Sequence, residues 1–186
     1  MCRYSMCGPY KSHFACFACR KAFKQPAIEE WLAVRGQDFA YRELVNLWSH
    51  RSALARREAE LGIRLVDLQA EYRDSAHRCP VCGEPMVDLG LDFKAPRQSD
   101  AKAWRILQGM FRIGHMFHTC GCDGPGYVPQ NPSQYRAYLE HRRRGYLEEL
   151  VRIQAADALS AEQKREARSY WSERVSRVDV ELASLR

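Results

Sequence analysis

Apolar residues along this chain recur at helical spacing in two long stretches, and the segments around those stretches lack that spacing. In residues 39–75, leucines recur every three or four positions, a pattern typical of helices that pack as coiled coils or bundles. We expect one long helix or two helices in series there, with Gly62 as the point of a kink or break. A short helix is predicted at 27–34, because Pro26 suits a first helical turn and Gly36 suits a C-terminal cap.

The second stretch lies at the C-terminal end, and its helix starts are visible in the sequence. Asn131 and Pro132 predict the start of a long helix, because Asn caps well and Pro lacks only an N–H that has no helical partner there. Ser160 and Gln163 have the spacing of a capping box, which predicts the start of a terminal helix. Two helices joined by a short connection are therefore expected.

The segment between these stretches combines short strands with one more helix. Residues 86–93 alternate between apolar and polar positions, which predicts a strand or hairpin. Ser99 or Asp100 can cap a helix that runs to about Arg112. Residues 114–119 are expected to form a strand that leads into a cysteine-containing turn.

Two Cys-x-x-Cys turns, far apart in the sequence, carry the strongest chemical signal. Cys16 and Cys19 form the first turn, and Cys79 and Cys82 form the second. A structural zinc ion takes four ligands, with Zn–S bonds of about 2.3 Å, and each such turn supplies two thiolates. We predict one Zn²⁺ bound by these four residues, with unligated buried thiols as the weaker alternative.

The chain has eight cysteines, so a second metal site is an open alternative. Its candidate ligands are Cys2, Cys7, Cys120, Cys122 and His118. A rival division of the ligands pairs Cys79 and Cys82 with Cys120 and Cys122, and joins the other four cysteines in a second site. Both divisions satisfy the four-ligand rule for structural zinc.

Catalytic signals are weak by comparison. The segment from His115 to Asp123 holds enough histidine, cysteine and acid for a catalytic zinc with an open position. A histidine beside a structural turn is the favoured interpretation of the same residues. The sequence contains no nucleophile elbow, phosphate loop or nucleotide-binding glycine pattern.

The net charge of +6 is concentrated at the N-terminus. The first 26 residues contain no Asp or Glu and five basic residues, namely Arg3, Lys11, Arg20, Lys21 and Lys24. Cations bind phosphates and interleaved rings stack on bases, so this region is the expected contact for RNA, DNA or the ribosome. The densest basic run, His141–Arg144, has Glu residues at helical spacing and is expected to form a solvated helix face with at most a local anion contact.

Several segments resemble one group of proteins. These are Cys2-Arg3-Tyr4, YKSHFACFACRKAF at 10–23, CPVCG at 79–83, GLDFKAP at 90–96 and FHTCGCDGPGY at 117–127. Together they resemble a group of bacterial zinc-ribbon-like proteins, over about half of the chain. The resemblance implies zinc on Cys16, Cys19, Cys79 and Cys82 and a bacterial cytosolic setting. It implies no reaction.

We therefore predict a mostly helical α+β fold with a zinc-ribbon-like head built from residues 1–26 and 76–130. The helical insertion of residues 27–75 and the C-terminal helices of 131–186 are expected to pack together as an antiparallel bundle. The sequence has no apolar run long enough to span a membrane and no signal peptide, so we expect a cytoplasmic protein without membrane contact.

The leading functional hypothesis is a non-enzymatic zinc-binding structural or adaptor protein. It would contact nucleic acid, the ribosome or a protein partner through the basic head, and its helices would allow self-association. One alternative is a metal-dependent hydrolase or nuclease with its site near His115–Asp123. Another is a thiol redox or metal-responsive regulator, in which zinc release frees the thiolates.

Overall fold

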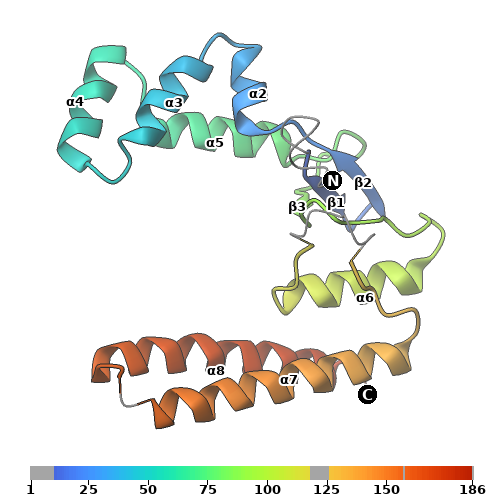
Figure 1. Ribbon diagram of the computed structural model, residues 1–186. Coiled ribbons are helices and arrows are strands. Elements are labelled where there is room, and N and C mark those ends of the chain that lie inside the picture. Colours follow the sequence, from blue (N-terminus) through green and yellow to red (C-terminus); the bar gives the residue numbers. More distant parts are fainter. Residues whose placement is uncertain (1–10, 118–125, 157, 186) are drawn as a thin grey trace, which may run out of the picture. The chain divides into compact units, whose positions relative to one another are not determined.

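The computed structural model describes residues 11–117, 126–156 and 158–185 and has a mostly helical α+β fold (Figure 1). Helices account for 58% of the chain, and the strands form a small three-stranded antiparallel sheet. The predicted fold class is confirmed at this level. Within the described ranges, no helix is both long and apolar enough to cross a membrane.

The contacts within the chain divide it into two compact units. The first unit is Met1–Ala95 with Phe117–Gly126, and the second is Pro96–Met116 with Tyr127–Arg186. The helices of 27–75 thus share a unit with the Cys-x-x-Cys turns, and residues 96–116 belong with the C-terminal helices. Packing of residues 131–186 on 27–75 stays a prediction.

The sheet of the first unit has the order β2-β1-β3. Strand β1 (His13–Cys16) pairs antiparallel with both β2 (Lys21–Lys24) and β3 (Val87–Asp88). The strand expected over residues 86–93 is therefore much shorter than predicted. Gly90, at φ 97°, turns the chain after β3. Gly90 then forms one isolated parallel β-bridge with Phe117. That bridge is the only β-structure that the described part of residues 114–119 contains.

Four helices follow one another between the two Cys-x-x-Cys turns. The sequence predicted two or three helices there, one at 27–34 and one or two at 39–75. They are α2 (Ile28–Ala33), α3 (Asp38–Asn46), α4 (Arg51–Leu61) and α5 (Leu65–Ala76). The short helix at 27–34 is confirmed as α2. The expectation of one or two helices over 39–75 is wrong, because the segment breaks twice.

One break has a local cause at Gly62, and the other is recognised by the packing that it allows. Gly62 ends α4 in the left-handed conformation at φ 64°, as its position predicted. The side chain of Glu58 then accepts a hydrogen bond of 2.8 Å from the backbone N–H of Leu65 and so caps α5. The break between α3 and α4 lets Leu44 and Leu68 meet in one buried cluster with Leu32 and Leu65, because a straight helix keeps residues so far apart in sequence separate.

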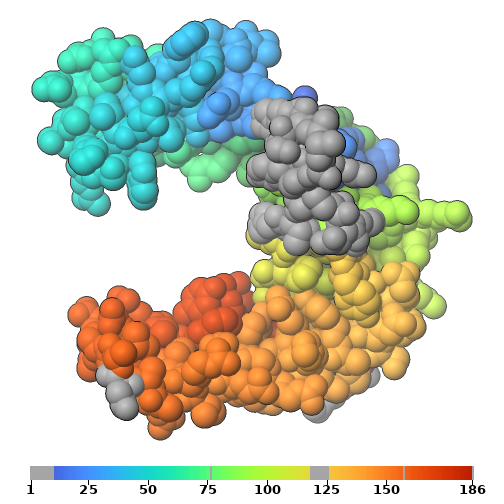
Figure 2. Space-filling view, in the orientation of Figure 1, coloured from blue at the N-terminus to red at the C-terminus, as the bar shows by residue number. Residues whose placement is uncertain are grey.

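The second unit contains three helices with the predicted starts. Helix α6 (Ala101–Arg112) is capped by Asp100, α7 (Pro132–Ala155) by Asn131 and α8 (Ala161–Ala183) by the Ser160–Gln163 capping box. Helices α7 and α8 form an antiparallel pair and α6 packs on α8. In Figure 2 the side chains of α8 (red) lie directly against those of α7 (orange). The larger bundle that includes residues 27–75 is not confirmed.

A glycine on α6 allows these three helices to approach one another. A Cβ atom on Gly109 would lie closer than 3.0 Å to both Tyr135 Oη of α7 and Glu181 Oε1 of α8. Tyr135 is 1% exposed and Glu181 is 7% exposed, and Arg112 Nη1 lies 3.8 Å from Glu181 Oε2. Burial, followed by the charge of Glu181, raises the pKa of Tyr135 above its usual range. The missing side chain at Gly109 therefore leaves room for Tyr135 of α7 and Glu181 of α8 against α6.

Candidate metal centre

The first Cys-x-x-Cys turn lies in the β1–β2 hairpin. Cys16 is the last residue of β1 and pairs with Lys21 of β2, so Cys19 lies in the four-residue turn between the strands. Arg20 has a φ of 54°, a left-handed backbone conformation that residues other than glycine seldom adopt. The backbone N–H of Cys19 lies 3.4 Å from Cys16 Sγ and points its hydrogen at that sulfur.

The second turn follows α5 and is closed by its own backbone hydrogen bonds. Cys79 N–H donates to the carbonyl of Glu84, and Gly83 N–H donates back to the carbonyl of Cys79, both at 2.8 Å. Gly83 has a φ of 75°, which a side chain would strain. An isolated bridge between Arg78 and Pro85 holds the ends of the turn together.

These two turns bring four sulfur atoms into one group. The Sγ atoms of Cys16, Cys19, Cys79 and Cys82 all lie within 4.8 Å of one another, and Cys16 Sγ lies 3.6 Å from Cys82 Sγ. Tetrahedral zinc with Zn–S bonds of about 2.3 Å requires sulfurs about 3.8 Å apart. All four are free thiols, with no disulfide between them. The group therefore fits a four-coordinate metal ion.

A small apolar cluster supports the sulfurs. Cys16 and Cys79 are 0% and 3% exposed, and they pack with Phe14 and Met86. Phe23 packs against the same cluster. The rings of Phe14 and Phe23 thus fill the core beside the thiols, which is the structural role that rings near such turns usually have.

The electrostatics of the four thiols favour a bound cation. Burial opposes ionisation of Cys79, but hydrogen bonds from the backbone of Val81 and Cys82 outweigh it and lower the Cys79 pKa to about 7. The hydrogen bond with Cys82, followed by burial, raises the pKa of Cys19 to about 12, and burial raises the pKa of Cys16. Four adjacent thiolates repel one another, and a divalent cation removes that repulsion.

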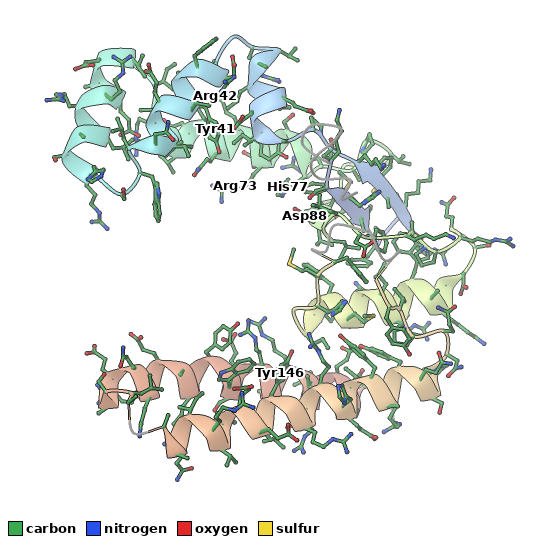
Figure 3. All side chains as sticks on the ribbon, viewed as in Figure 1. Tyr41, Arg42, Arg73, His77, Asp88 and Tyr146 are labelled. Atoms are coloured by element: carbon green, nitrogen blue, oxygen red, sulfur yellow. The ribbon has the colours of Figure 1, made fainter. Side chains whose placement is uncertain are left out.

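A histidine at the end of α5 joins the helices to this centre, and the sequence reasoning missed it. The His77 ring lies 4.7 Å from the Phe14 ring and 6.1 Å from the Tyr72 ring. Figure 3 shows His77 beside Asp88 of β3, where α5 meets the sheet. Burial lowers the pKa of His77. Its position just before the second turn is the only sequence signal for this role.

Other predicted ligands and contacts fall outside the described ranges. They are Cys2, Arg3, Cys7, His118, Cys120 and Cys122. The second zinc site and the rival division of the cysteines stay predictions for that reason.

The described basic residues of the N-terminal region lie around the first turn. Lys21 and Lys24 are on β2, an edge strand of the sheet, and Arg20 precedes them. Lys11 Nζ lies 3.3 Å from Glu30 Oε2 of α2 and is thus partly neutralised. Arg20 and Lys21 form no ion pair with any residue in the described ranges.

His115, the first residue of the proposed hydrolase segment, contacts a tyrosine, and it belongs to no group of three or more potential metal ligands among the described residues. Its Nδ1 lies 2.8 Å from Tyr138 Oη. Burial and the positive charge of Arg142 lower the His115 pKa to about 4. The hydrolase hypothesis otherwise depends on residues 118–123, which lie outside the described ranges.

No protein-family model, curated protein or solved structure matches this chain.

Proposed function

We propose that this protein is a non-enzymatic zinc-binding module in which Zn²⁺ on Cys16, Cys19, Cys79 and Cys82 has a structural role. The observation that carries the proposal is the cluster of four sulfurs within 4.8 Å of one another. Four thiolates fill a tetrahedral zinc site and leave no position for water or substrate, which is the arrangement of structural and not catalytic zinc.

The structural role follows from the small size of the core at this site. Among the residues that the structure describes, Phe14, Cys16, Cys79 and Met86 form its buried cluster, with Cys19 and Phe23 partly buried beside them. So few apolar side chains supply little burial free energy. Metal binding then contributes directly to folding, because the four ligands do not form a site in the unfolded chain.

We further propose that the zinc-held hairpin presents a positive surface to nucleic acid, free or within the ribosome. Support comes from Arg20 and Lys21, whose charges no acidic residue of the described ranges neutralises. Such cations bind phosphates and release counterions, so binding should weaken steeply with salt. The competing explanation is that lysines on an edge strand prevent the strand from pairing with other chains. That explanation predicts no binding of nucleic acid.

Metal analysis with single substitutions tests the zinc site. The purified chain should contain at least one zinc ion, and Cys16→Ser and Cys79→Ser should each remove one equivalent. Ala18→Ser places a hydroxyl on an exposed residue of the same turn and should leave the zinc content unchanged. Full zinc content in both cysteine variants would overturn the proposed ligand set.

Salt-dependent binding tests the nucleic-acid contact separately. Lys21→Gln should weaken binding of a single-stranded oligonucleotide and reduce the salt slope by about one. Lys11→Gln removes a lysine that already pairs with Glu30 and is the matched control. Equal effects of the two substitutions would contradict the proposed surface and leave the zinc site unaffected.

A further inference from the structure

Rings and arginines form a continuous row of contacts on α7 and α8. The Arg142 guanidinium carbon lies 5.9 Å from the centre of the Tyr138 ring and 5.6 Å from that of Tyr146. The Tyr146 ring lies 5.4 Å from the Trp171 ring of α8, with 41° between the planes. Spacing of four residues along α7 places Tyr138, Arg142 and Tyr146 on one side of the helix.

The row continues along α8. The Trp171 and Tyr170 rings are 5.0 Å apart, and the Arg174 guanidinium carbon lies 3.4 Å from the Tyr170 ring centre. Tyr170 is 48% exposed, so the end of the row faces solvent. Stacking on rings leaves the positive charge of an arginine uncompensated, whereas a carboxylate neutralises it.

Arg142 and Arg174 differ in this respect from their neighbours. Arg143 Nε lies 2.7 Å from Asp179 Oδ1, and Arg152 Nη1 lies 2.7 Å from Glu149 Oε1. Arg142 and Arg174 form no ion pair with any residue that the structure describes. The row therefore carries two free positive charges held against aromatic surfaces.

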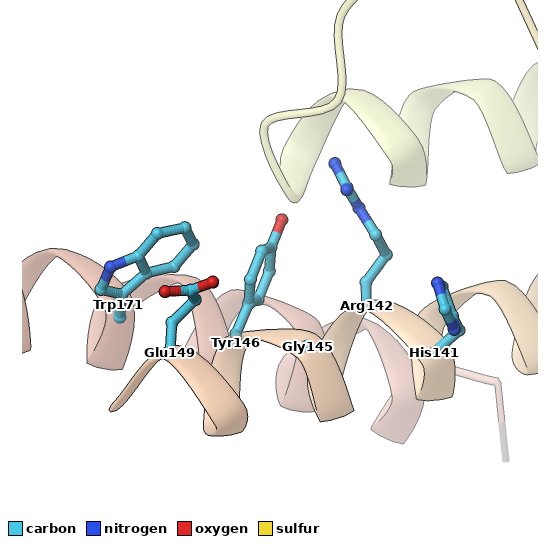
Figure 4. A pocket seen from close by; sticks show the side chains of 6 residues that line it. All are labelled: His141, Arg142, Gly145, Tyr146, Glu149 and Trp171. Carbon is cyan, nitrogen blue, oxygen red and sulfur yellow. The ribbon is translucent and has the colours of Figure 1, made fainter. Parts of the chain in front are cut away.

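A pocket of about 230 Å³ lies within this row (Figure 4). It is lined by His141, Arg142, Gly145, Tyr146, Glu149 and Trp171. Figure 4 shows Arg142 and Tyr146 side by side on α7, with Glu149 and Trp171 on the other side of Tyr146 from Arg142. Since drug-sized ligands occupy about 300–1,000 Å³, this pocket suits one planar ring system better than a whole ligand.

Gly145, in the wall of the pocket, has no packing reason to be glycine. It lies in the interior of the 24-residue helix α7, where glycine is less favourable than alanine. A Cβ atom at this position would meet no atom within 4 Å. Glycine here therefore costs helix stability without relieving any close contact.

Arg142 also has an unsatisfied group. Its Nε atom is buried and has no hydrogen-bond acceptor among the described residues. A buried charged donor without a partner is unfavourable. Arg142 also lines the pocket, where its guanidinium group can bind an anion. Arg142 in the pocket wall thus favours an anionic ligand, and the rings of Tyr146 and Trp171 favour a planar one.

We propose that this pocket binds one nucleotide of a single-stranded nucleic acid, with its base stacked on Tyr146 and Trp171 and its phosphate at Arg142. Base faces stack on aromatic side chains, and arginines bind the neighbouring phosphates, in many proteins that bind single strands. Arg174, whose guanidinium carbon lies 5.9 Å from the Trp171 ring centre, adds a second positive charge beside the pocket. The small volume favours one base of a strand over an enclosed free nucleotide. The proposal involves the second unit alone and does not depend on the metal centre.

Fluorescence anisotropy with the zinc-loaded full chain tests this site. The probes are labelled oligo(U) RNA and oligo(dT) DNA of about 12 nucleotides, within the range of sites that single-strand binders occupy. Tyr146→Ala should weaken binding roughly 5- to 100-fold, the loss that removal of one stacked base produces. Tyr146→Phe keeps the ring and should retain most of the affinity. Arg142→Gln should weaken binding by at least as much as Tyr146→Ala.

Arg144→Gln is the matched control, because it removes one positive charge from an exposed residue of the same helix. It should change affinity about twofold or less. Equal losses in Arg142→Gln and Arg144→Gln, or unchanged affinity in Tyr146→Ala, would overturn the site. Displacement of the oligonucleotide by an equimolar mononucleotide would overturn the assignment to a strand. Circular dichroism should show unchanged helix content in every variant compared.

Discussion

The sulfur atoms of Cys16 and Cys82 lie 3.6 Å apart, although 66 positions separate these residues in the chain. Helices α2 to α5 occupy the intervening sequence. A metal ion shared by the two turns would therefore hold together the ends of a segment that contains all four of these helices. The two Cys-x-x-Cys turns thus mark both ends of the helical segment of the first unit and bring those ends together.

Removal of zinc should loosen the sheet of the first unit. With a chelator, hydrogen exchange of the Phe14 and Ala15 amides should accelerate, because β1 ends at the ligand Cys16 and loses the tie that the metal provides there. The amides in the middle of α7 belong to the other unit and should keep their protection. Unchanged exchange in β1 after complete metal removal would show that the ion has no structural role.

Two glycine-to-alanine substitutions should change stability in opposite directions. Gly109→Ala should destabilise the protein by about 1–3 kcal/mol, because its Cβ would overlap Tyr135 Oη and Glu181 Oε1. Gly145→Ala should stabilise it by up to about 1 kcal/mol, because alanine favours the helix and its Cβ meets nothing. Urea denaturation followed by circular dichroism measures both. Equal effects of the two substitutions would refute the close approach at Gly109.

The cap of α8 should contribute measurably to stability. Ser160→Ala should cost about 1 kcal/mol, because it removes the side-chain oxygen that accepts from the Gln163 backbone N–H at 3.2 Å. Ser169→Ala, which changes the same residue type in the interior of α8, is the control and should cost less. A loss no larger than that of the control would show that the cap is not formed in solution.

Stability of the second unit should fall in mild acid because of His115. Its pKa is about 4 in the folded chain, below the ordinary value of 6.5, so the unfolded chain binds the proton more tightly. The stabilising contribution is therefore complete above about pH 6.5 and is lost as the pH falls towards 4. Burial, followed by the charge of Arg142, disfavours the protonated ring.

His115→Gln isolates this contribution, because other groups titrate in the same range. The difference in unfolding free energy between the natural chain and the variant should shrink from pH 7 to pH 4.5. A difference that stays constant over this range would contradict the depressed pKa of His115.

Helix starts could be predicted from the sequence because their causes are local. Asp100, Asn131 and Ser160 each accept a hydrogen bond from a backbone N–H three residues later, as their residue types indicated. The break at Gly62 was equally local, since glycine adopts positive φ at little cost.

Other features depend on partners distant in sequence and could not be predicted. The spacing of leucines continues across the end of α3, so nothing local marks the break that brings Leu44 to Leu68. The strand at Val87–Asp88 is limited by the turn at Gly90 and its bridge to Phe117. The contacts of Gly109 with Tyr135 and Glu181 join three helices, and no spacing rule within one helix predicts them.

The same distinction applies to the candidate sites. The Cys-x-x-Cys turns could be recognised because two ligands of a zinc site lie within one short turn. The basic run at His141–Arg144 indicated a solvated helix face with at most a local anion contact. It did not indicate a pocket, because the surroundings of Arg142 depend on Trp171 of another helix through Tyr146. Sequence spacing on α7 alone does not show that contact.

X-ray absorption spectroscopy of the protein loaded with one equivalent of zinc tests the central claim most directly. Four sulfur ligands at about 2.3 Å are predicted for the site formed by Cys16, Cys19, Cys79 and Cys82. A coordination shell with nitrogen or oxygen ligands, or an exchangeable water on the metal, would contradict a closed structural site and favour a catalytic one.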